Sequence, residues 1–224
     1  LGEKTPFPER EASEEHYELS PSYRKLFDGV YEFSRELVAS GESLNGWQRR
    51  IRYWTALALL RCVMSSPAAA SAAIGKRLQG LGEEEEGIDD EYLPSIYETE
   101  DRDSTDLQPS QIIEEGSEEL PDTDARKLSA FAKQTESLTG DDDRKMENCA
   151  SMVEGFLEEG FSPIVLCRYI ATSDYVAAEL ERRLGRRFKE LRVVSITGLL
   201  SDDERILKVG ELADFPQKLL VATD

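Results

Sequence analysis

Apolar side chains recur at helical spacing through the first third of the chain. Ser20 and Pro21 form a helix-start signal, an N-cap followed by proline at the first helical position, and the pattern predicts a helix over residues 21–39. After the breaking stretch GESLNG, a second helical pattern begins, with one face that carries Ile51, Trp54, Leu57, Ala58, Arg61 and Cys62. Pro67 should end or interrupt this helix, and the alanine-rich remainder predicts another one.

The middle of the chain is strongly acidic. Residues 83–124 hold 18 acidic side chains and one basic side chain, Arg102, and so account for most of the net charge of −19. A segment this poor in apolar residues cannot bury a core, so we interpret residues 82–125 as a largely flexible insertion, pinned at most at Tyr92, Leu93, Ile96 and Tyr97. An acidic interaction arm and a mimic of nucleic acid are the alternatives to a solvated insertion.

Two amphipathic stretches follow the acidic segment, ARKLSAFAKQTESL and RKMENCASMVEGFLEEG. Both predict helices with one apolar face. The second stretch ends at Gly160, a typical C-terminal stop, and its apolar side carries Met146, Cys149, Val153, Phe156 and Leu157.

Short apolar runs then alternate with helical patterns. The runs IVLC, VVSI and KLLVAT predict strands near residues 164, 193 and 219, and one helix lies between each pair. The second of these helices begins with a capping box formed by Ser201 and Glu204. Strands separated by single helices form right-handed βαβ units, so the predicted fold class is α/β with a parallel sheet.

Both faces of a parallel sheet are normally covered by other elements. Three strands form only a narrow sheet, so we expect the predicted sheet to be part of a larger one. Ligands bind such sheets at the carboxyl ends of the strands. Here those ends are residues 168–172, residues 197–200 and the positions after Thr223.

The composition narrows the class of protein. Cys62, Cys149 and Cys167 are odd in number and widely spaced, which favours free thiols in a reducing cytoplasm over a disulfide framework. No apolar run is long enough for a signal peptide or a membrane span, so we expect no membrane partner. The only histidine, His16, is expected at the surface, and no grouping of residues has the spacing of a metal site or a His-dependent catalytic site.

The strand ends carry a family resemblance. PIVLCRYIATSDYVAAEL resembles motif IV of helicase superfamily two, SITGLLSDDER resembles the motif that follows it, and LLVATD resembles the start of motif V. Upstream, ELSPSYRKLFDGV, ALALLRCVMSSP and ARKLSAFAK are similar to segments that link the two motor lobes of Swi/Snf-type DNA translocases. The amino-acid sequences of these segments are most similar to those of large bacterial Swi/Snf-like helicases. This group includes the helicase subunit of the DISARM anti-phage system.

The resemblance implies three parts: residues 1–81 as an inter-lobe extended segment with helices, residues 82–125 as a variable insertion, and residues 126–224 as the first half of a RecA-like lobe, a three-layer α/β unit. The sequence contains no G-x-x-x-x-G-K-[ST] phosphate loop and no arginine-bearing motif VI. The resemblance therefore places ATP and Mg mostly on the other lobe of a longer protein. These residues alone are expected to hydrolyse no ATP and to bind no cofactor or metal.

The resemblance also implies partners and contact residues. The partners are double-stranded DNA, the first RecA-like lobe of the same protein and other subunits of a defence system. The residues expected at the nucleic acid are Arg168, Thr197, Gly198 and Thr223, and Asp224 is expected at the lobe interface. Simpler alternatives stay open at two strand ends: Gly198 permits a turn and Thr197 ends a strand, and the Tyr169 ring beside Arg168 packs on the following helix.

Other charged residues favour structural interpretations. A basic cluster beside three aromatic residues could bind phosphates; it consists of Arg49, Arg50 and Arg52 beside Trp47, Tyr53 and Trp54. A helix that buries its tryptophans and leaves its arginines in water explains the same pattern. Glu204 and Arg205 are expected to stabilise their own helix.

A different class of function remains open, a non-catalytic interaction module that binds a basic partner through its acidic arm. A Rossmann-like nucleotide enzyme is disfavoured because no glycine-rich turn follows any predicted strand.

The acidic segment generates a test. If it lies near the DNA-binding surface, it repels phosphates, so deletion of residues 83–124 should increase affinity for DNA, most strongly at low salt. Fluorescence anisotropy with a labelled duplex measures the change. Equal affinities of the two chains at low salt would rule out autoinhibition.

Overall fold

The computed structural model describes residues 12–41, 46–79, 122–138 and 140–223. Its helices are α1 (Pro21–Ser40), α2 (Gly46–Ser65), α3 (Pro67–Gln79), α6 (Asp122–Ser137), α7 (Arg144–Glu158), α8 (Ile170–Leu184) and α9 (Asp202–Ala213). The short 3₁₀ helix η2 (Gly140–Asp142) precedes α7, and the strands are β1 (Ile164–Cys167), β2 (Leu191–Ile196) and β3 (Gln217–Thr223). The fold is mixed α/β. Residues 80–121, which include most of the acidic insertion, lie outside the described residues.

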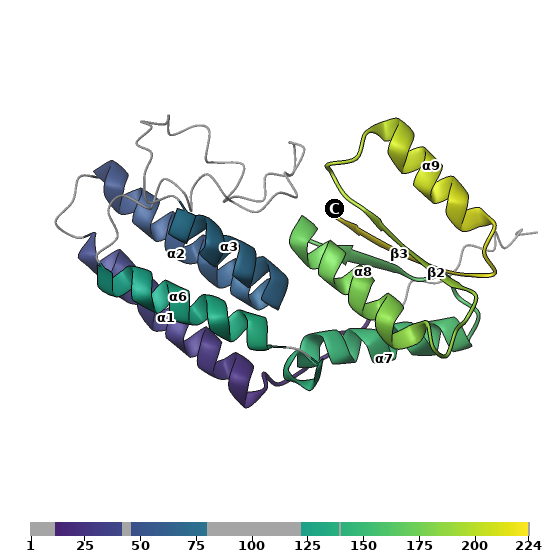
Figure 1. The fold of residues 1–224 in the computed structure, drawn as a ribbon, viewed down its shortest axis with the longest axis horizontal. Helices are drawn as coiled ribbons and strands as arrows, with labels where there is room; N and C mark the ends of the chain where they lie inside the picture. The colour runs from purple at the N-terminus through teal and green to yellow at the C-terminus, as the bar shows by residue number, and fades with distance from the viewer. Residues whose placement is uncertain (1–11, 42–45, 80–121, 139, 224) are drawn as a thin grey trace, which may run out of the picture.

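Helices α1, α2, α3 and α6 pack side by side as a helical bundle (Figure 1). The predicted start of α1 is confirmed: the Ser20 hydroxyl accepts a hydrogen bond from the Tyr23 backbone N–H at 3.1 Å, and Pro21 is the first helical residue. Pro67 separates α2 from α3, as its missing N–H and fixed φ predict.

Helix α2 is buried on more than the predicted face. Trp54, Ala58 and Cys62 are buried as expected, but Leu59 and Val63 are also completely buried. The reason is that α2 packs against α1 on one side and α3 on the other.

Helix α6 packs in the bundle. Leu128, Phe131 and Leu138 belong to the same hydrophobic core as residues of α1, α2 and α3, so the helical core extends past residue 125. Gly29 of α1 allows the close approach, because a Cβ atom there would lie 2.7 Å from a ring carbon of Phe131.

Helix α7 begins at the N-cap Asp143, whose carboxylate accepts the Met146 N–H at 3.1 Å. Gly160 follows the helix with φ of 85°, so the predicted glycine stop is confirmed. Phe156, which the pattern placed on the apolar side of this helix, is not buried with Met146, Val153 and Leu157. Its side chain is 44% exposed and packs edge-to-face on Phe161, with ring centroids 6.2 Å apart.

The strands form a three-stranded parallel sheet with order β1-β3-β2 in the described part of the chain. Parallel pairing was predicted, and β1 has the predicted bounds. Strand β2 begins at Leu191, two residues before the predicted start at Val193, and β3 lies between the other two.

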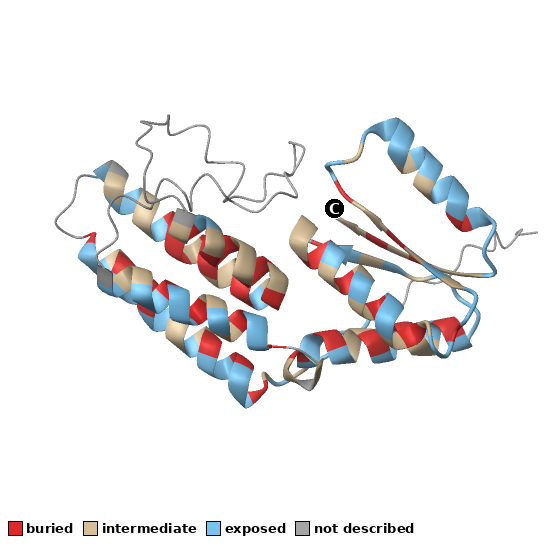
Figure 2. Ribbon diagram, in the orientation of Figure 1, coloured by how far each residue is buried: buried red, intermediate tan, exposed pale blue. Residues whose placement is uncertain are grey.

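Helices lie on both faces of this sheet (Figure 1). Leu219 and Val221 of β3 pack into a core with α7 and α8, and this face is well buried (Figure 2). On the other face, α9 contacts β2. The side chains of Ile164 and Leu166 on β1 are 63% and 66% exposed there, so the β1 side of this outer sheet face is open to solvent.

Three glycines in helices give a test of the packing. Gly155 in α7 and Gly210 in α9 have no neighbour within 4 Å of a built Cβ atom, whereas Gly29 faces Phe131. Replacing Gly155 or Gly210 by Ala should raise the free energy of unfolding by about 0.5–1 kcal/mol. Gly29→Ala should lower it, because the methyl group collides with the Phe131 ring. Urea unfolding measures all three. Equal stabilisation by the three substitutions would contradict the close contact of α1 with α6.

Candidate functional site

The ends of the strands lie level with one another. Cys167 at the end of β1 pairs with Thr223 of β3, and Ile196 at the end of β2 pairs with Ala222. Thr197 therefore lies at the level of Thr223, and Arg168 follows one residue beyond. The register brings Arg168, Thr197, Gly198 and Thr223 to one side of the sheet, which we call the carboxyl edge. Asp224 lies outside the described residues.

The two residues after β2 differ in exposure. The Thr197 side chain is buried, 8% exposed, and its carbonyl accepts the Leu200 N–H at 3.1 Å to close a turn. Gly198 is exposed in this turn, and the only described glycines with positive φ are Gly140 and Gly160. The turn at Gly198 therefore does not need the left-handed conformation. Gly198 offers exposed backbone to a ligand, and Thr197 mainly fixes the turn.

The turn is held from α9. The Arg205 guanidinium donates to the Gly198 carbonyl at 3.4 Å and pairs with Asp202 at 3.6 Å, so the predicted local pairing of Arg205 is confirmed. The capping box is also confirmed: the Ser201 hydroxyl accepts the Glu204 N–H, and the Glu204 carboxylate accepts the Ser201 N–H. The pKa of Glu204 is lowered by the hydrogen bonds that its carboxylate accepts from the Ser201 N–H and from the Ser201 hydroxyl.

A chain of polar side chains lies behind the edge and was not predicted. The hydroxyls of Ser173 and Ser195 are 3.1 Å apart, and the Ser195 hydroxyl donates to the Asp174 carboxylate at 3.0 Å. The Lys208 ammonium donates to the Ser195 carbonyl at 3.3 Å. The chain ties β2 to α8 and α9. Its one sequence signal is the serine that interrupts the apolar run VVSI.

Tyr169 anchors the first strand end in the helical bundle. Its side chain is 5% exposed and belongs to the bundle core, whereas Arg168 beside it is exposed. The ring therefore packs on the bundle instead of on the following helix. Three residues further along, the Thr172 hydroxyl lies 2.8 Å from that of Ser65 and 2.9 Å from that of Ser66, at the α2–α3 junction.

The arginines at the start of α2 lie elsewhere on the bundle. Trp54 is buried, and Arg49 and Arg50 are exposed, in agreement with the structural interpretation of this segment. The Arg52 guanidinium donates to the Ser40 hydroxyl of α1. The side chain of Trp47 lies outside the described residues.

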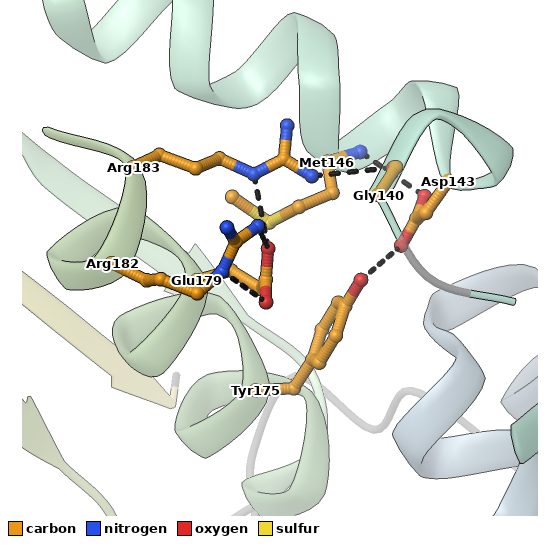
Figure 3. Close-up of polar contacts among 7 residues, drawn as sticks. All are labelled: Gly140, Asp143, Met146, Tyr175, Glu179, Arg182 and Arg183. Atoms are coloured by element: carbon orange, nitrogen blue, oxygen red, sulfur yellow. Dashed lines mark hydrogen bonds and ion pairs between the residues drawn. The ribbon is translucent and has the colours of Figure 1, made fainter.

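A second contact holds the start of α7 against α8. Figure 3 shows the Tyr175 hydroxyl directed at the Asp143 carboxylate, to which it donates at 2.9 Å. Arg183 pairs with Glu179 at 3.0 Å and donates to the Gly140 carbonyl at 3.3 Å. Burial and the negative Asp143 raise the pKa of Tyr175 far above its ordinary value.

Comparison of the chain with protein-family models, with curated proteins and with solved structures gave no match. Among the described residues, no helix combines the length and the apolar character that crossing a membrane requires. In the same part of the chain, no group of three or more His, Cys, Asp or Glu side chains is arranged to hold a metal ion.

The Tyr175 contact predicts a pH dependence. A phenol whose folded pKa is raised stabilises the fold fully below the unfolded pKa, about 10, and its contribution is lost as the pH rises through the folded value. The free energy of unfolding should therefore fall above about pH 10. Tyr175→Phe should cost about 1–2 kcal/mol at neutral pH and make the alkaline loss smaller.

The matched control is Tyr31→Phe, because Tyr31 is 45% exposed. Chemical denaturation at neutral and alkaline pH compares the two variants. An alkaline loss that is the same in Tyr175→Phe as in the parent chain would contradict the assignment.

Proposed function

We propose that this chain is part of an ATP-dependent DNA translocase of the Swi/Snf-like kind and supplies DNA-backbone contacts from its second motor lobe. The observation that carries the proposal is the register of the sheet. It places Arg168, Gly198 and Thr223, which come from three separate motifs, along the carboxyl edge, where parallel sheets bind ligands. Contacts from exposed backbone, hydroxyl and guanidinium groups position a phosphate backbone without reading sequence.

In this proposal, residues 126–224 contain the first half of a three-layer RecA-like lobe, and α6 at their start packs with the helical bundle. The layers that support it are α7 and α8 on one face of the sheet and α9 on the other. The helical bundle is then the inter-lobe region. Because Tyr169 is buried in the bundle core, the bundle holds the carboxyl edge in place.

ATP and Mg would bind mainly to the other lobe. The sequence has no phosphate loop, the element that holds the nucleotide phosphates and their Mg in motors of this kind. This part of the protein would therefore bind DNA and close on the first lobe, whereas hydrolysis needs both lobes. The proposed setting is the bacterial cytoplasm, in phage defence together with other subunits.

A second candidate is a non-catalytic interaction module. The observation in its favour is a surface of exposed apolar side chains on α9 and β1. Ile206 and Leu207 are 69% and 67% exposed, and Ile164 and Leu166 are comparably exposed. Exposed apolar surface of this kind often marks a protein contact. It does not explain why the polar candidates gather at the carboxyl edge, so the translocase is preferred.

The test is DNA-stimulated ATP hydrolysis by the full-length protein. Duplex DNA should stimulate hydrolysis, and Thr223→Ala should reduce the stimulated rate about tenfold or more, because it removes a hydroxyl at the carboxyl edge. Ser129→Ala is the matched control: its exposed hydroxyl donates only to the Ala125 carbonyl in its own helix, at 2.8 Å. No hydrolysis with or without DNA would reject the translocase in favour of the interaction module.

A further inference from the structure

Two arginines from distant parts of the sequence converge near the carboxyl edge. Arg168 follows β1 and hydrogen-bonds the side chain of Tyr169, and Arg61 on α2 also acts electrostatically on that phenol. Burial raises the pKa of Tyr169, and both arginines oppose part of this rise. The phenol thus lies in the positive field of cations supplied by the helical bundle and by the sheet.

The hydrogen bonds between α2 and α8 explain this convergence. Arg61 precedes Ser65 by four residues, so the two lie on the same face of α2. Ser65 contacts Thr172 at 2.8 Å, and Thr172 follows Arg168 by four residues. Arg61 therefore lies one helical turn from this contact, and Arg168 lies just before Tyr169, the N-cap of α8.

The groups beneath the arginines are neutral. Tyr169 hydrogen-bonds the completely buried Cys62, and burial raises the pKa of this thiol to about 12. The raised pKa values of Cys62 and Tyr169 keep both groups protonated at neutral pH. The anchor thus adds no negative charge, and it holds Arg168 through a charge-assisted hydrogen bond.

We propose that Arg61 and Arg168 together bind one stretch of nucleic-acid backbone, so that phosphates held at the carboxyl edge also contact α2 of the helical bundle. This inference rests on the proposed DNA-binding function and extends it to the bundle. Guanidinium groups suit the task, because they bind phosphate oxygens through two parallel N–H donors. A phosphate between two like charges also relieves their mutual repulsion. The bundle is then part of the binding surface, and Tyr169 is a positioning residue.

The experiment is the salt dependence of duplex binding by the full chain, measured by fluorescence anisotropy with Arg61→Gln and Arg168→Gln. Each substitution should weaken binding and reduce the slope of log K against log salt by about 0.9, the value for one phosphate contact. Arg186→Gln is the matched control. Arg186 is exposed in the loop between α8 and β2, at the opposite end of the strands, and its substitution should leave the slope unchanged.

Two further variants separate binding from folding. Tyr169→Phe keeps the ring buried but removes the hydrogen bond to Arg168, so it should weaken binding while the thermal unfolding midpoint changes little. Arg61→Lys keeps the charge and should restore most of the salt slope lost in Arg61→Gln. The series is repeated in the chain without residues 83–124, so that repulsion by the acidic segment does not hide the contacts.

The outcomes are distinct. A slope that falls in Arg168→Gln but not in Arg61→Gln would overturn the two-arginine site and leave the proposed function standing. Equal effects of Arg61→Gln and Arg186→Gln would also overturn it, because the loss would then be one of general charge. No binding of duplex by either form of the chain would overturn both the inference and the proposed function.

Discussion

The contact between the first strand end and the helical bundle is the constraint on which the rest of the molecule depends. The Tyr169 ring is buried in the bundle core, and the Thr172 hydroxyl contacts both serines of the α2–α3 junction. Since α8 begins at Ile170, this contact also fixes the helix that packs under all three strands. The position of the carboxyl edge is therefore set by the helices as well as by the sheet.

The bundle and the sheet are joined by a few specific polar contacts. The Ser20 hydroxyl at the start of α1 donates to the Asp142 carbonyl, just before α7, at 2.7 Å. The Lys145 ammonium donates to the carbonyls of Met64 and Ser65, both at 3.2 Å, which satisfies backbone groups at the end of α2. Such contacts define one arrangement, because each requires a particular partner at a particular distance.

Local signals in the sequence predicted the elements well. Ser20 with Pro21, Ser201 with Glu204 and Gly160 act on backbone groups within a few residues, so their effects could be predicted without knowing the fold. The parallel pairing followed from the alternation of strands and helices. These features also placed the candidate residues at strand ends, which is as far as sequence alone defined the site.

What the sequence did not predict depends on neighbours far along the chain. The central place of β3, the burial of Tyr169 in the bundle and the second buried face of α2 all arise from tertiary contacts. Arg77 is an extreme case. An arginine near a helix end is expected in water, yet this one is 1% exposed, and burial lowers its pKa to about 10.

The strand order has a consequence for synthesis on the ribosome. Within the described part of the chain, β1 and β2 pair with β3, which is made after both of them, and not with each other. Neither of the earlier strands can complete its backbone hydrogen bonds when it emerges, whereas helices α1, α2, α3 and α6 precede the sheet and contain the whole bundle. The bundle is thus the part that can form first, and it offers the pocket for Tyr169 before the sheet exists. Pairing of β1 and β2 waits for β3, and until then their unpaired backbone N–H and C=O groups are open to chaperones and to other nascent chains.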